Sequence, residues 1–387
     1  MSDPGSAPAG AGAASAARQW LMRIRRLPLS RPVRIMNVCG GHERSIAQGG
    51  LRSLMPDGVE LIPGPGCPVC VCPEEDVYAA IRIALDHDVT LVTFGDMLRV
   101  PANVAKGEIR TLEAAKAAGA DVRPIASPLE AVAIADADPA RTVVFFAVGF
   151  ETTMAPVAAM MRERLPDNLL LLLSGRRTWP AVAMLLASGR PGFDALVAPG
   201  HVSTVMGPLE WAFVVRDHAM PCAVAGFSAD SLLAAIYSTL RQIAENRPVL
   251  DNCYAGAVRN EGNPTAQRHL AAAMSIVDAP WRGIGVIPCS GYKLRPEYAA
   301  HDARPVFAEE VEAGRRRVGE MPPGCACAEV VLGRIYPTGC PLYGTACLPR
   351  QPVGPCMVSD EGACRIWWSA GARRDRERDR RLEPACK

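Results

Sequence analysis

Short apolar runs alternate with helical patterns between residues 31 and 245 of the chain. Six of these runs have the length and composition of buried strands: residues 33–38, 89–94, 142–148, 168–173, 195–198 and 222–225. Residues 228–245 instead repeat apolar positions every three or four residues, which predicts an amphipathic helix. Strands that alternate with helices are typical of parallel sheets built from βα units. The pattern therefore predicts an α/β fold.

We expect two α/β lobes that meet near residues 126–141, where Ser127-Pro128 and the segment 136–139 resemble a linker. After Pro248 the apolar pattern becomes irregular, and a third, cysteine-rich unit follows. The expected organisation begins with a disordered Ala/Gly/Pro/Ser tract at residues 1–30. Two α/β domains follow, at residues 31–135 and 136–247. An iron–sulfur domain at residues 248–370 and a charged tail at residues 371–387 complete the chain.

Composition and charge exclude some classes of function. The chain has 387 residues, of which 49% are hydrophobic and 21% are charged, as in an ordinary soluble protein. A net charge of +2 gives no support to nucleic acid as the main partner. The longest apolar runs are strand-sized, and no export signal is visible near Arg25-Arg26. We therefore expect a cytoplasmic protein with neither nucleic acid nor membrane as a partner.

Six of the fourteen cysteines lie between residues 325 and 364, in a stretch broken throughout by Gly and Pro. Such a stretch has little apolar periodicity with which to build a core, and thiolates gathered on a metal would supply cross-links. Disulfides are the alternative, but they need an oxidising compartment. Soft sulfur ligands on irregular loops favour an iron–sulfur cluster.

A second feature is Cys39-Gly40-Gly41-His42-Glu43, which follows the first predicted strand. The carboxyl ends of strands are where open α/β sheets bind ligands, and two glycines allow a sharp turn and a close approach. The N-terminus of the following helix is expected to lower the pKa of Cys39 and leave a thiolate for metal binding. The alternative is a packed βα turn with an inert cysteine.

A third feature is the segment GPGCPVCVCPEE at residues 64–75, in which Cys67 and Cys70 form a C-x-x-C pair. Pro73 suits the first position of a helix, and Glu74 and Glu75 suit its first turn. Cysteines that precede a helix N-terminus favour a reversible dithiol/disulfide couple. A structural zinc half-site is the alternative, although no second pair at ordinary finger spacing accompanies it.

Further polar residues follow predicted strands at Gly95-Asp96, at Gly149-Phe150-Glu151-Thr152-Thr153 and at Gly200-His201. Each suits a cleft, and each suits a helix cap or turn equally well. Cys222, Cys253, Cys289 and Cys386 have no partner spacing and are interpreted as incidental thiols. The chain has no Walker A motif, GxGxxG, HExxH or GxSxG, so nucleotide and common hydrolase functions have little support.

Together these segments resemble the HypD family of hydrogenase maturation factors. The resemblance rests on CGGHE at 39–43, GPGCPVCV at 64–71, GDMLRVP at 95–101, GFETT at 149–153, EGN at 261–263 and the block from Cys325 to Cys364. It implies a scaffold, with redox activity, for building the Fe(CN)2CO group of [NiFe] hydrogenases. It also implies a HypC chaperone as partner, HypE as cyanide donor with HypF upstream, and a [4Fe-4S] cluster. The hydrogenase large subunit would be served indirectly.

The resemblance also implies residue roles. Cys39 would hold iron together with a cysteine of HypC, and His42 and Glu43 would orient ligands or move protons beside it. Cys67 and Cys70 would be the redox-active pair. The cluster would be held by Cys325 or Cys327 with three further cysteines, Cys340, Cys347 and Cys364, while Cys356 is a less certain candidate.

Three positions depart from the family pattern. Cys72 adds a thiol that would compete in disulfide exchange, Cys289 stands where similar sequences often have glycine, and Gly226-Phe227 lacks the Glu-Pro expected after it. Two alternative functions remain: a free-standing dithiol oxidoreductase that acts on protein disulfides, and a binding scaffold whose cluster is purely structural.

Overall fold

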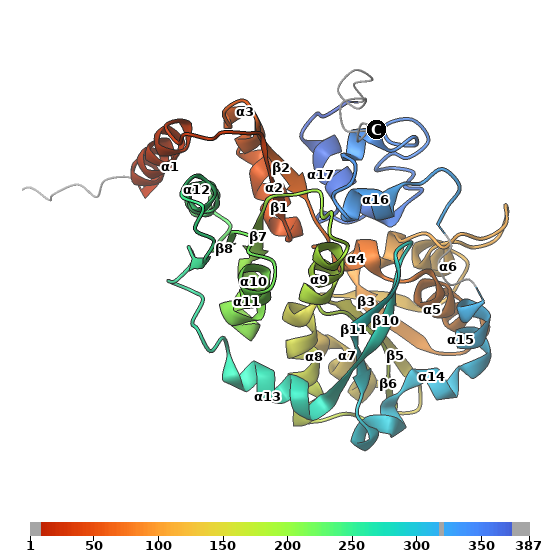
Figure 1. Cartoon of the computed structure of the whole chain (residues 1–387). Helices are drawn as coiled ribbons and strands as arrows, with labels where there is room; N and C mark the ends of the chain where they lie inside the picture. Colours follow the sequence, from red (N-terminus) through yellow and green to blue (C-terminus); the bar gives the residue numbers. More distant parts are fainter. Residues whose placement is uncertain (1–8, 317–320, 374–387) are drawn as a thin grey trace, which may run out of the picture.

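The computed structural model describes residues 9–316 and 321–373, with the side chains of residues 9–15 left out, and it has the expected α/β fold with two parallel sheets (Figure 1). Sheet A has the order β2-β1-β7-β8-β9, and sheet B has the order β4-β3-β5-β6. Within each sheet every neighbouring pair of strands is parallel. No helix in the described part of the chain is long and apolar enough to cross a membrane.

Sheet A and its helices come from two separated parts of the chain. Its strands are β1 (Val33–Asn37), β2 (Val59–Pro63), β7 (Ala195–Pro199), β8 (Cys222–Ala225) and β9 (Leu250–Asn252). Its helices are α1 (Ala9–Arg25), α2 (Gly40–Gln48), α3 (Leu51–Leu54), α9 (Trp179–Ala187), α10 (Gly200–Met206), η2 (Pro208–Trp211), α11 (Ala212–Arg216) and α12 (Ala229–Ala244). Apolar side chains fill both faces of this sheet, as expected for a parallel sheet.

Sheet B is inserted between β2 and β7. Its strands are β3 (Thr90–Phe94), β4 (Val122–Ile125), β5 (Val143–Gly149) and β6 (Leu169–Gly175), and its helices are α4 (Pro68–Val71), α5 (Glu74–Asp86), η1 (Gly95–Arg99), α6 (Leu112–Ala117), α7 (Pro128–Ala137) and α8 (Glu151–Glu163). Every residue of β5 and β6 is buried. The expected junction at 126–141 lies inside this sheet, because β3 pairs with both β4 and β5. The sheets thus divide the chain differently from the ranges 31–135 and 136–247.

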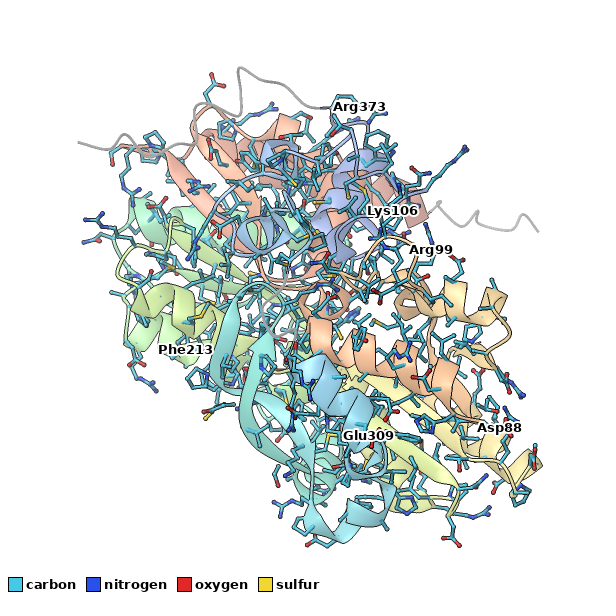
Figure 2. The ribbon with its side chains drawn as sticks, turned by 90° about the vertical axis from the view of Figure 1, so that its right-hand side faces the viewer. Asp88, Arg99, Lys106, Phe213, Glu309 and Arg373 are labelled. Carbon is cyan, nitrogen blue, oxygen red and sulfur yellow. A yellow bond between two sulfur atoms is a disulfide. The ribbon has the colours of Figure 1, made fainter. Side chains whose placement is uncertain are left out.

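The part after residue 250 is more regular than its pattern suggests. It holds α13 (Pro264–Ala273), the antiparallel hairpin of β10 (Met274–Trp281) and β11 (Gly285–Leu294), η3 (Pro296–His301), α14 (Ala303–Val306) and α15 (Ala308–Arg315). The cysteine-rich segment then contains α16 (Cys327–Val331), η4 (Pro337–Gly339), η5 (Pro355–Met357) and α17 (Ala363–Ser369). In the side view, this segment lies above the hairpin and sheet B (Figure 2).

The expected disorder of residues 1–30 is wrong for the part that the structure describes. Residues Ala9–Arg25 form α1, which packs on α12, and the rings of Trp20 and Tyr237 lie 5.4 Å apart. An Ala-rich sequence has high helix propensity. Burial of Ile24 where α1 packs on α12 stabilises α1 further. Residues 1–8 and most of the expected tail lie outside the described residues.

Candidate functional site

Cys39 lies at the point in sheet A where the strand order reverses. The chain passes from β1 to β2 on one side, whereas β7 pairs with β1 on the other, so the switch point lies at the carboxyl ends of β1 and β7. Cys39 directly follows β1 and is the N-cap of α2, and Gly200 and His201 follow β7. Open α/β sheets bind their ligands at such a switch point. The topology therefore supports the choice of Cys39 from its motif.

Glycines bring the two cysteine motifs together at this switch point. The amide of Gly40 donates to the carbonyl of Gly66, at 3.1 Å, so the turn before Cys67 lies directly against the turn after Cys39. A Cβ atom on Gly40 would stand 2.5 Å from the Cβ of Glu361, in the cysteine-rich segment. The close approach of three chain segments requires glycine here.

The pKa of Cys39 differs from the expectation. Burial raises it to about 12, and the charge of Glu361 acts in the same direction. The backbone amides of His42 and Gly41 donate to the sulfur and lower the pKa by less. The expected net lowering by the helix N-terminus is therefore wrong, because desolvation of the thiolate outweighs the amides. The amides remain placed to stabilise a sulfur that binds metal.

His42 is completely buried, and its Nε2 lies 3.0 Å from the carbonyl oxygen of Ala225. Because a carbonyl only accepts, Nε2 carries the proton, and Nδ1 is an acceptor with no hydrogen-bond partner among the described residues. Burial lowers the pKa of His42 to about 4, so the ring is neutral at neutral pH. Phe227 separates this ring from His201, with centroid distances of 4.9 and 3.8 Å.

The carboxylate of Glu43 is held by hydrogen bonds from three side chains. Its carboxylate is 2% exposed and accepts hydrogen bonds from Asn37 at 2.9 Å, from Arg52 at 2.6 and 2.7 Å, and from the indole of Trp367 at 2.6 Å. Arg52 also lies over the ring of Trp367, 4.8 Å from its centroid. Glu43 thus connects α2 to α17 through its hydrogen bond with Trp367. No pattern in the sequence predicts this connection.

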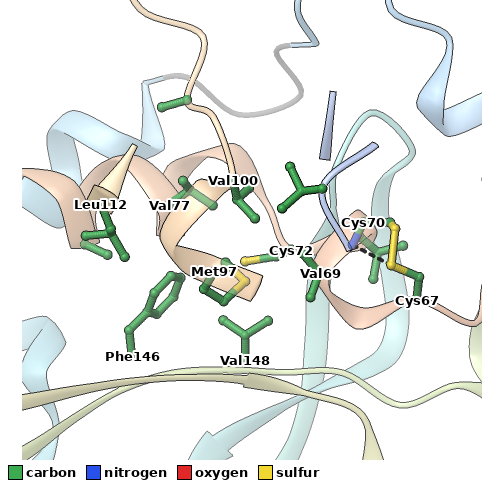
Figure 3. Close-up of a cluster of buried hydrophobic side chains, with 14 of the residues drawn as sticks. Cys67, Val69, Cys70, Cys72, Val77, Met97, Val100, Leu112, Phe146 and Val148 are labelled. Atoms are coloured by element: carbon green, nitrogen blue, oxygen red, sulfur yellow. Dashed lines mark hydrogen bonds between the residues drawn. A yellow bond between two sulfur atoms is a disulfide. The ribbon is translucent and has the colours of Figure 1, made fainter. Parts of the chain in front are cut away.

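The C-x-x-C pair begins a short helix. Cys67 is the N-cap of α4 and accepts a hydrogen bond from the amide of Cys70, and a disulfide joins the two residues (Figure 3). Both are almost completely buried. The helix packs against η5 and α16 of the cysteine-rich segment. The structure therefore brings the predicted redox pair to the elements that contain Cys327 and Cys356.

The thiols of the cysteine-rich segment converge in one buried group. Cys325 contacts Cys327 and Cys340 through sulfur, and Cys327 and Cys364 both contact Cys356. Their S–H donors hold the pKa of Cys356 well below its usual range, and the same contacts raise that of Cys364. Cys356, the less certain candidate, is completely buried at the centre of the group.

The group fits an iron–sulfur cluster in its chemistry. Backbone amides of Ala326, Val353 and Cys364 donate to cysteine sulfurs at 3.5, 3.4 and 3.2 Å, which stabilises thiolate charge. A Cβ atom on Gly354 would stand 2.5 Å from the sulfur of Cys325, so only glycine leaves room there. Among the described His, Cys, Asp and Glu residues, no group of three is arranged to hold a single metal ion. A cluster differs from such a site because each of its irons takes its own thiolate.

Other predicted residues have structural partners. Glu151 accepts hydrogen bonds from the amide and hydroxyl of Thr178, at 2.7 and 2.6 Å, and so holds the chain after β6. Asp96 accepts from the hydroxyl of Ser359, at 2.7 Å, and ties sheet B to the cysteine-rich segment. No sequence motif predicts the contact of Glu361 with the turn after Cys39. The same is true of the hydrogen bond from Ser359 to Asp96.

The remaining thiols have different surroundings. Cys72 is fully buried at the edge of an apolar cluster, with Ser174 3.6 Å away, and burial, with the charge of Asp76 acting in the same direction, raises its pKa to about 12 (Figure 3). A thiol with so little thiolate is a poor competitor in disulfide exchange, contrary to the expectation. Cys222 is buried in β8, Cys253 is partly buried, and Cys289 is exposed on the hairpin. Cys386 lies outside the described residues.

The sequence of this chain is similar to those of known proteins. Residues 15–371 match the sequence model of HypD, described as the hydrogenase formation hypA family. Hydrogenase maturation factor HypD of Rhodobacter capsulatus is 40% identical over 354 residues, covering 90% of this chain and 92% of that protein. The HypD protein of Escherichia coli K12 is 40% identical over 346 residues, covering 87% and 89%. Hydrogenase maturation factor HypD2 of Bradyrhizobium diazoefficiens is 38% identical over 360 residues, covering 90% and 92%.

Proposed function

Because the chain belongs to the HypD family of hydrogenase maturation factors, we propose that it is the scaffold on which the Fe(CN)2CO group of [NiFe] hydrogenases is assembled. Iron and its diatomic ligands are the cargo in this proposal. The protein supplies the thiols that bind the iron and the thiols that provide electrons. A HypC-type chaperone is the partner that shares the iron, and HypE, itself supplied by HypF, delivers cyanide. The hydrogenase large subunit receives the product indirectly.

One observation carries the proposal: three cysteine groups that lie far apart in the sequence meet at one place. The hydrogen bond from Gly40 to Gly66 joins the Cys39 turn to the C-x-x-C motif. The packing of α4 on η5 and α16 joins that motif to the cysteine-rich segment. Glu361 of the same segment lies against Gly40. Nothing in a purely structural role for each cysteine group would require this convergence.

Cys39 is the proposed iron ligand. Thiolates suit low-spin iron that carries cyanide and carbon monoxide. The amides of Gly41 and His42 point at its sulfur and would stabilise the bound thiolate, and iron would replace the proton that burial otherwise retains. The neutral ring of His42 presents an acceptor at Nδ1. We assign His42 to orienting a ligand or partner group, and Glu43 to positioning α2 rather than to moving protons.

The C-terminal thiols are the proposed holders of a [4Fe-4S] cluster, with Cys325 or Cys327 joined by Cys340, Cys347 and Cys364. When bound, such a cluster supplies or accepts one electron at a time. The chain itself contributes the burial that excludes water and the amides that donate to sulfur. The six thiols exceed the four that a cluster takes, so Cys356 and one member of the C-x-C are left as neighbours.

The Cys67–Cys70 pair is the proposed store of reducing equivalents. Reduction of its disulfide takes up two electrons and yields two thiols when two protons are also taken up. The α4 helix that follows Cys67 packs on elements of the cysteine-rich segment, and Gly66, next to Cys67, accepts a hydrogen bond from Gly40, next to Cys39. This position suits a dithiol that serves the reductive attachment of cyanide to iron.

Replacement of the proposed iron ligand tests the function. In protein isolated without oxygen together with its HypC partner, we expect Cys39→Ala to abolish the infrared bands of iron-bound CN and CO and to leave the absorption of the cluster. Cys289→Ala, which removes an exposed thiol on the hairpin strand β11, is the matched control and should keep the bands. Bands that persist in Cys39→Ala would refute the assignment of the iron to this residue.

A free-standing dithiol oxidoreductase is the alternative function, and the formed disulfide is the observation that favours it. Its burial argues against attack on a bulky protein disulfide, because exchange needs access to sulfur. Turnover of a protein disulfide without the HypC partner would support this alternative. Intact CN/CO assembly in Cys67→Ala and Cys70→Ala would instead support a scaffold with no electron flow.

A further inference from the structure

A cavity of about 430 Å³ is lined by α13 and by the β10–β11 hairpin. Its walls include Gln267 and Leu270 of α13, Met274 and Tyr292 of the hairpin, and Met206 at the end of α10. Helix α13 packs on both α8 and α10, so the cavity lies where elements of the two sheets meet (Figure 1). A cavity of this size with a mainly apolar lining is typical of a small-molecule site.

Two arginines line the same cavity, which we call the arginine pocket. Arg177 follows β6, and Arg295 directly follows β11. The Nε atom of each is buried and has no hydrogen-bond partner among the described residues. Buried N–H donors nearly always have an acceptor, because leaving one unpaired costs free energy. None of the described residues that line the pocket is acidic. The pocket therefore offers two cations with free donors and lacks an anion.

The guanidinium of Arg177 is held in place from several sides. It donates through Nη1 to the carbonyl of Cys289 at 3.1 Å, and it lies over the ring of Trp179, 5.1 Å from the centroid. The hydroxyl of Tyr292 contacts it as well, and the side chain of Arg177 is only 11% exposed. A guanidinium that is already fixed loses little entropy when it binds an anion.

The acid nearest to Arg177 offsets little of this charge at neutral pH. The carboxyl group of Glu210 lies 3.5 Å from Arg177. Burial, with the charge of Glu151 next in importance, raises the pKa of Glu210 to about 8, so this carboxyl group is mostly protonated at pH 7. Glu210 is also not among the residues that line the pocket. The positive charge of the pocket is therefore left for a ligand to neutralise.

We propose that the arginine pocket binds a small organic acid, that is, a carboxylate with a short apolar body. The carboxylate oxygens accept hydrogen bonds from the Nε–H groups of Arg177 and Arg295, which have no other acceptor among the described residues. The apolar body lies against Leu270, Met274 and the ring of Tyr292. This inference goes beyond the proposed function and does not depend on it.

The lining favours an organic anion over an inorganic one. Phosphate or sulfate needs polar groups on all sides to replace its water, and side chains such as Met206 and Leu270 supply none. A ligand with an apolar body instead gains free energy from contact with these walls. Because the walls come from elements of both sheets, a bound ligand also stabilises the folded chain against unfolding.

The test uses the full chain, with hexanoate as the probe and hexanamide as its neutral counterpart. Saturation-transfer NMR titrations up to about 10 mM ligand give Kd, and thermal unfolding reports stabilisation. We expect hexanoate to bind and to raise the thermal midpoint. Hexanamide should bind weaker by roughly 10-fold or more, because hydrogen bonds from a guanidinium to a carboxylate are about twice as strong as neutral ones.

Two variants test the pocket itself. Arg295→Gln should raise the Kd of hexanoate by roughly 10-fold or more. Its ligand-free midpoint should not fall, because the Nε atom that it removes has no partner among the described residues. Ala271→Phe, at an exposed position of α13 that lines the pocket, keeps both arginines and should abolish binding by filling the space. Arg268→Gln, exposed on the same helix but outside the lining, is the matched control and should leave Kd within about twofold of the parent.

Several results would overturn the proposal. They are no hexanoate binding by the parent, equal affinity for hexanamide, and an unchanged Kd in either pocket variant. Displacement of hexanoate by an equal concentration of inorganic phosphate would show a general anion site and would refute the organic-acid assignment. None of these measurements involves iron or the cluster, so their failure is distinct from failure of the proposed function.

Discussion

At the scale of single residues, Cys289 is in a backbone conformation that favours glycine. Its φ is +52°, in the left-handed region, and its amide donates to the side chain of Asp278 on the facing strand, at 2.9 Å. The pairing of β10 with β11 shifts register next to that residue, between Val277 and Ala279. A non-glycine residue is strained at such a φ. The irregular hairpin thus explains why similar sequences often have glycine at this position.

We expect Cys289→Gly to stabilise the protein by about 1 kcal/mol or less, because relief of the left-handed strain exceeds the added entropy of the unfolded chain. For a chain of this size, the thermal midpoint should rise by about 1–3 °C. Cys289→Ala keeps both the Cβ atom and the strain, and it should leave the midpoint unchanged. A midpoint that falls in Cys289→Gly would contradict the strain argument.

At the scale of elements, one buried carboxylate joins two helices from opposite ends of the chain. Glu43 on α2 accepts from Trp367 on α17, and Tyr336 stacks on the same indole with ring centroids 5.2 Å apart. α17 also contains Cys364, and the turn before α2 contains Cys39. The tie therefore fixes the distance between the proposed iron ligand and the cysteine-rich segment.

Trp367→Phe should loosen this tie. The substitution keeps an aromatic ring beside Tyr336 but removes a donor to a buried carboxylate, which costs about 1–3 kcal/mol. We expect faster hydrogen exchange of the α17 amides and a lower thermal midpoint. Trp368→Phe is the matched control, because Trp368 contacts Tyr343 and Arg373 instead of Glu43. Equal exchange of α17 in the two variants would show that the hydrogen bond has no positioning role.

At the scale of the whole molecule, a largely buried group of ionisable residues lies between the two sheets. Glu210 comes from η2 on the sheet A side, and Glu151 and Arg177 follow β5 and β6 of sheet B. Burial, with the charge of Glu151 next in importance, raises the pKa of Glu210 to about 8. Arg177, at 3.5 Å, lowers that pKa but is outweighed. The junction between the lobes should therefore respond to pH.

The sign of this response follows from proton binding. Between about pH 5 and pH 8 the folded state keeps a proton on Glu210 that the unfolded chain has lost, so its contribution to stability falls as the pH rises. Glu210→Gln should remove this loss, and its thermal midpoint should exceed that of the parent by more at pH 8 than at pH 5. Glu297→Gln, at an exposed position, is the control. A difference that shrinks toward pH 8 would contradict the assignment.

Local patterns in the sequence determined the α/β class and the positions of most strands. Strands such as β5, buried along their whole length, have a continuous apolar run that only a covered parallel sheet accommodates. The cysteine motifs stand out as well, because Gly and Pro around thiols leave few other uses for them. The hairpin of β10 and β11 was not predicted, since a two-stranded ribbon that packs on other elements has a mixed pattern.

Only the tertiary structure decided how the thiols are arranged. Long-range pairing sends the chain from sheet A into sheet B and back, and no local pattern encodes that order. The same pairing partly buries Cys39 and reverses the expected direction of its pKa shift, because desolvation depends on segments that are distant in the sequence. It also commits Glu43 to Arg52 and Trp367, and it brings Cys356 to the centre of the thiol group. Residue type thus determined which groups can react, and packing decided which of them meet.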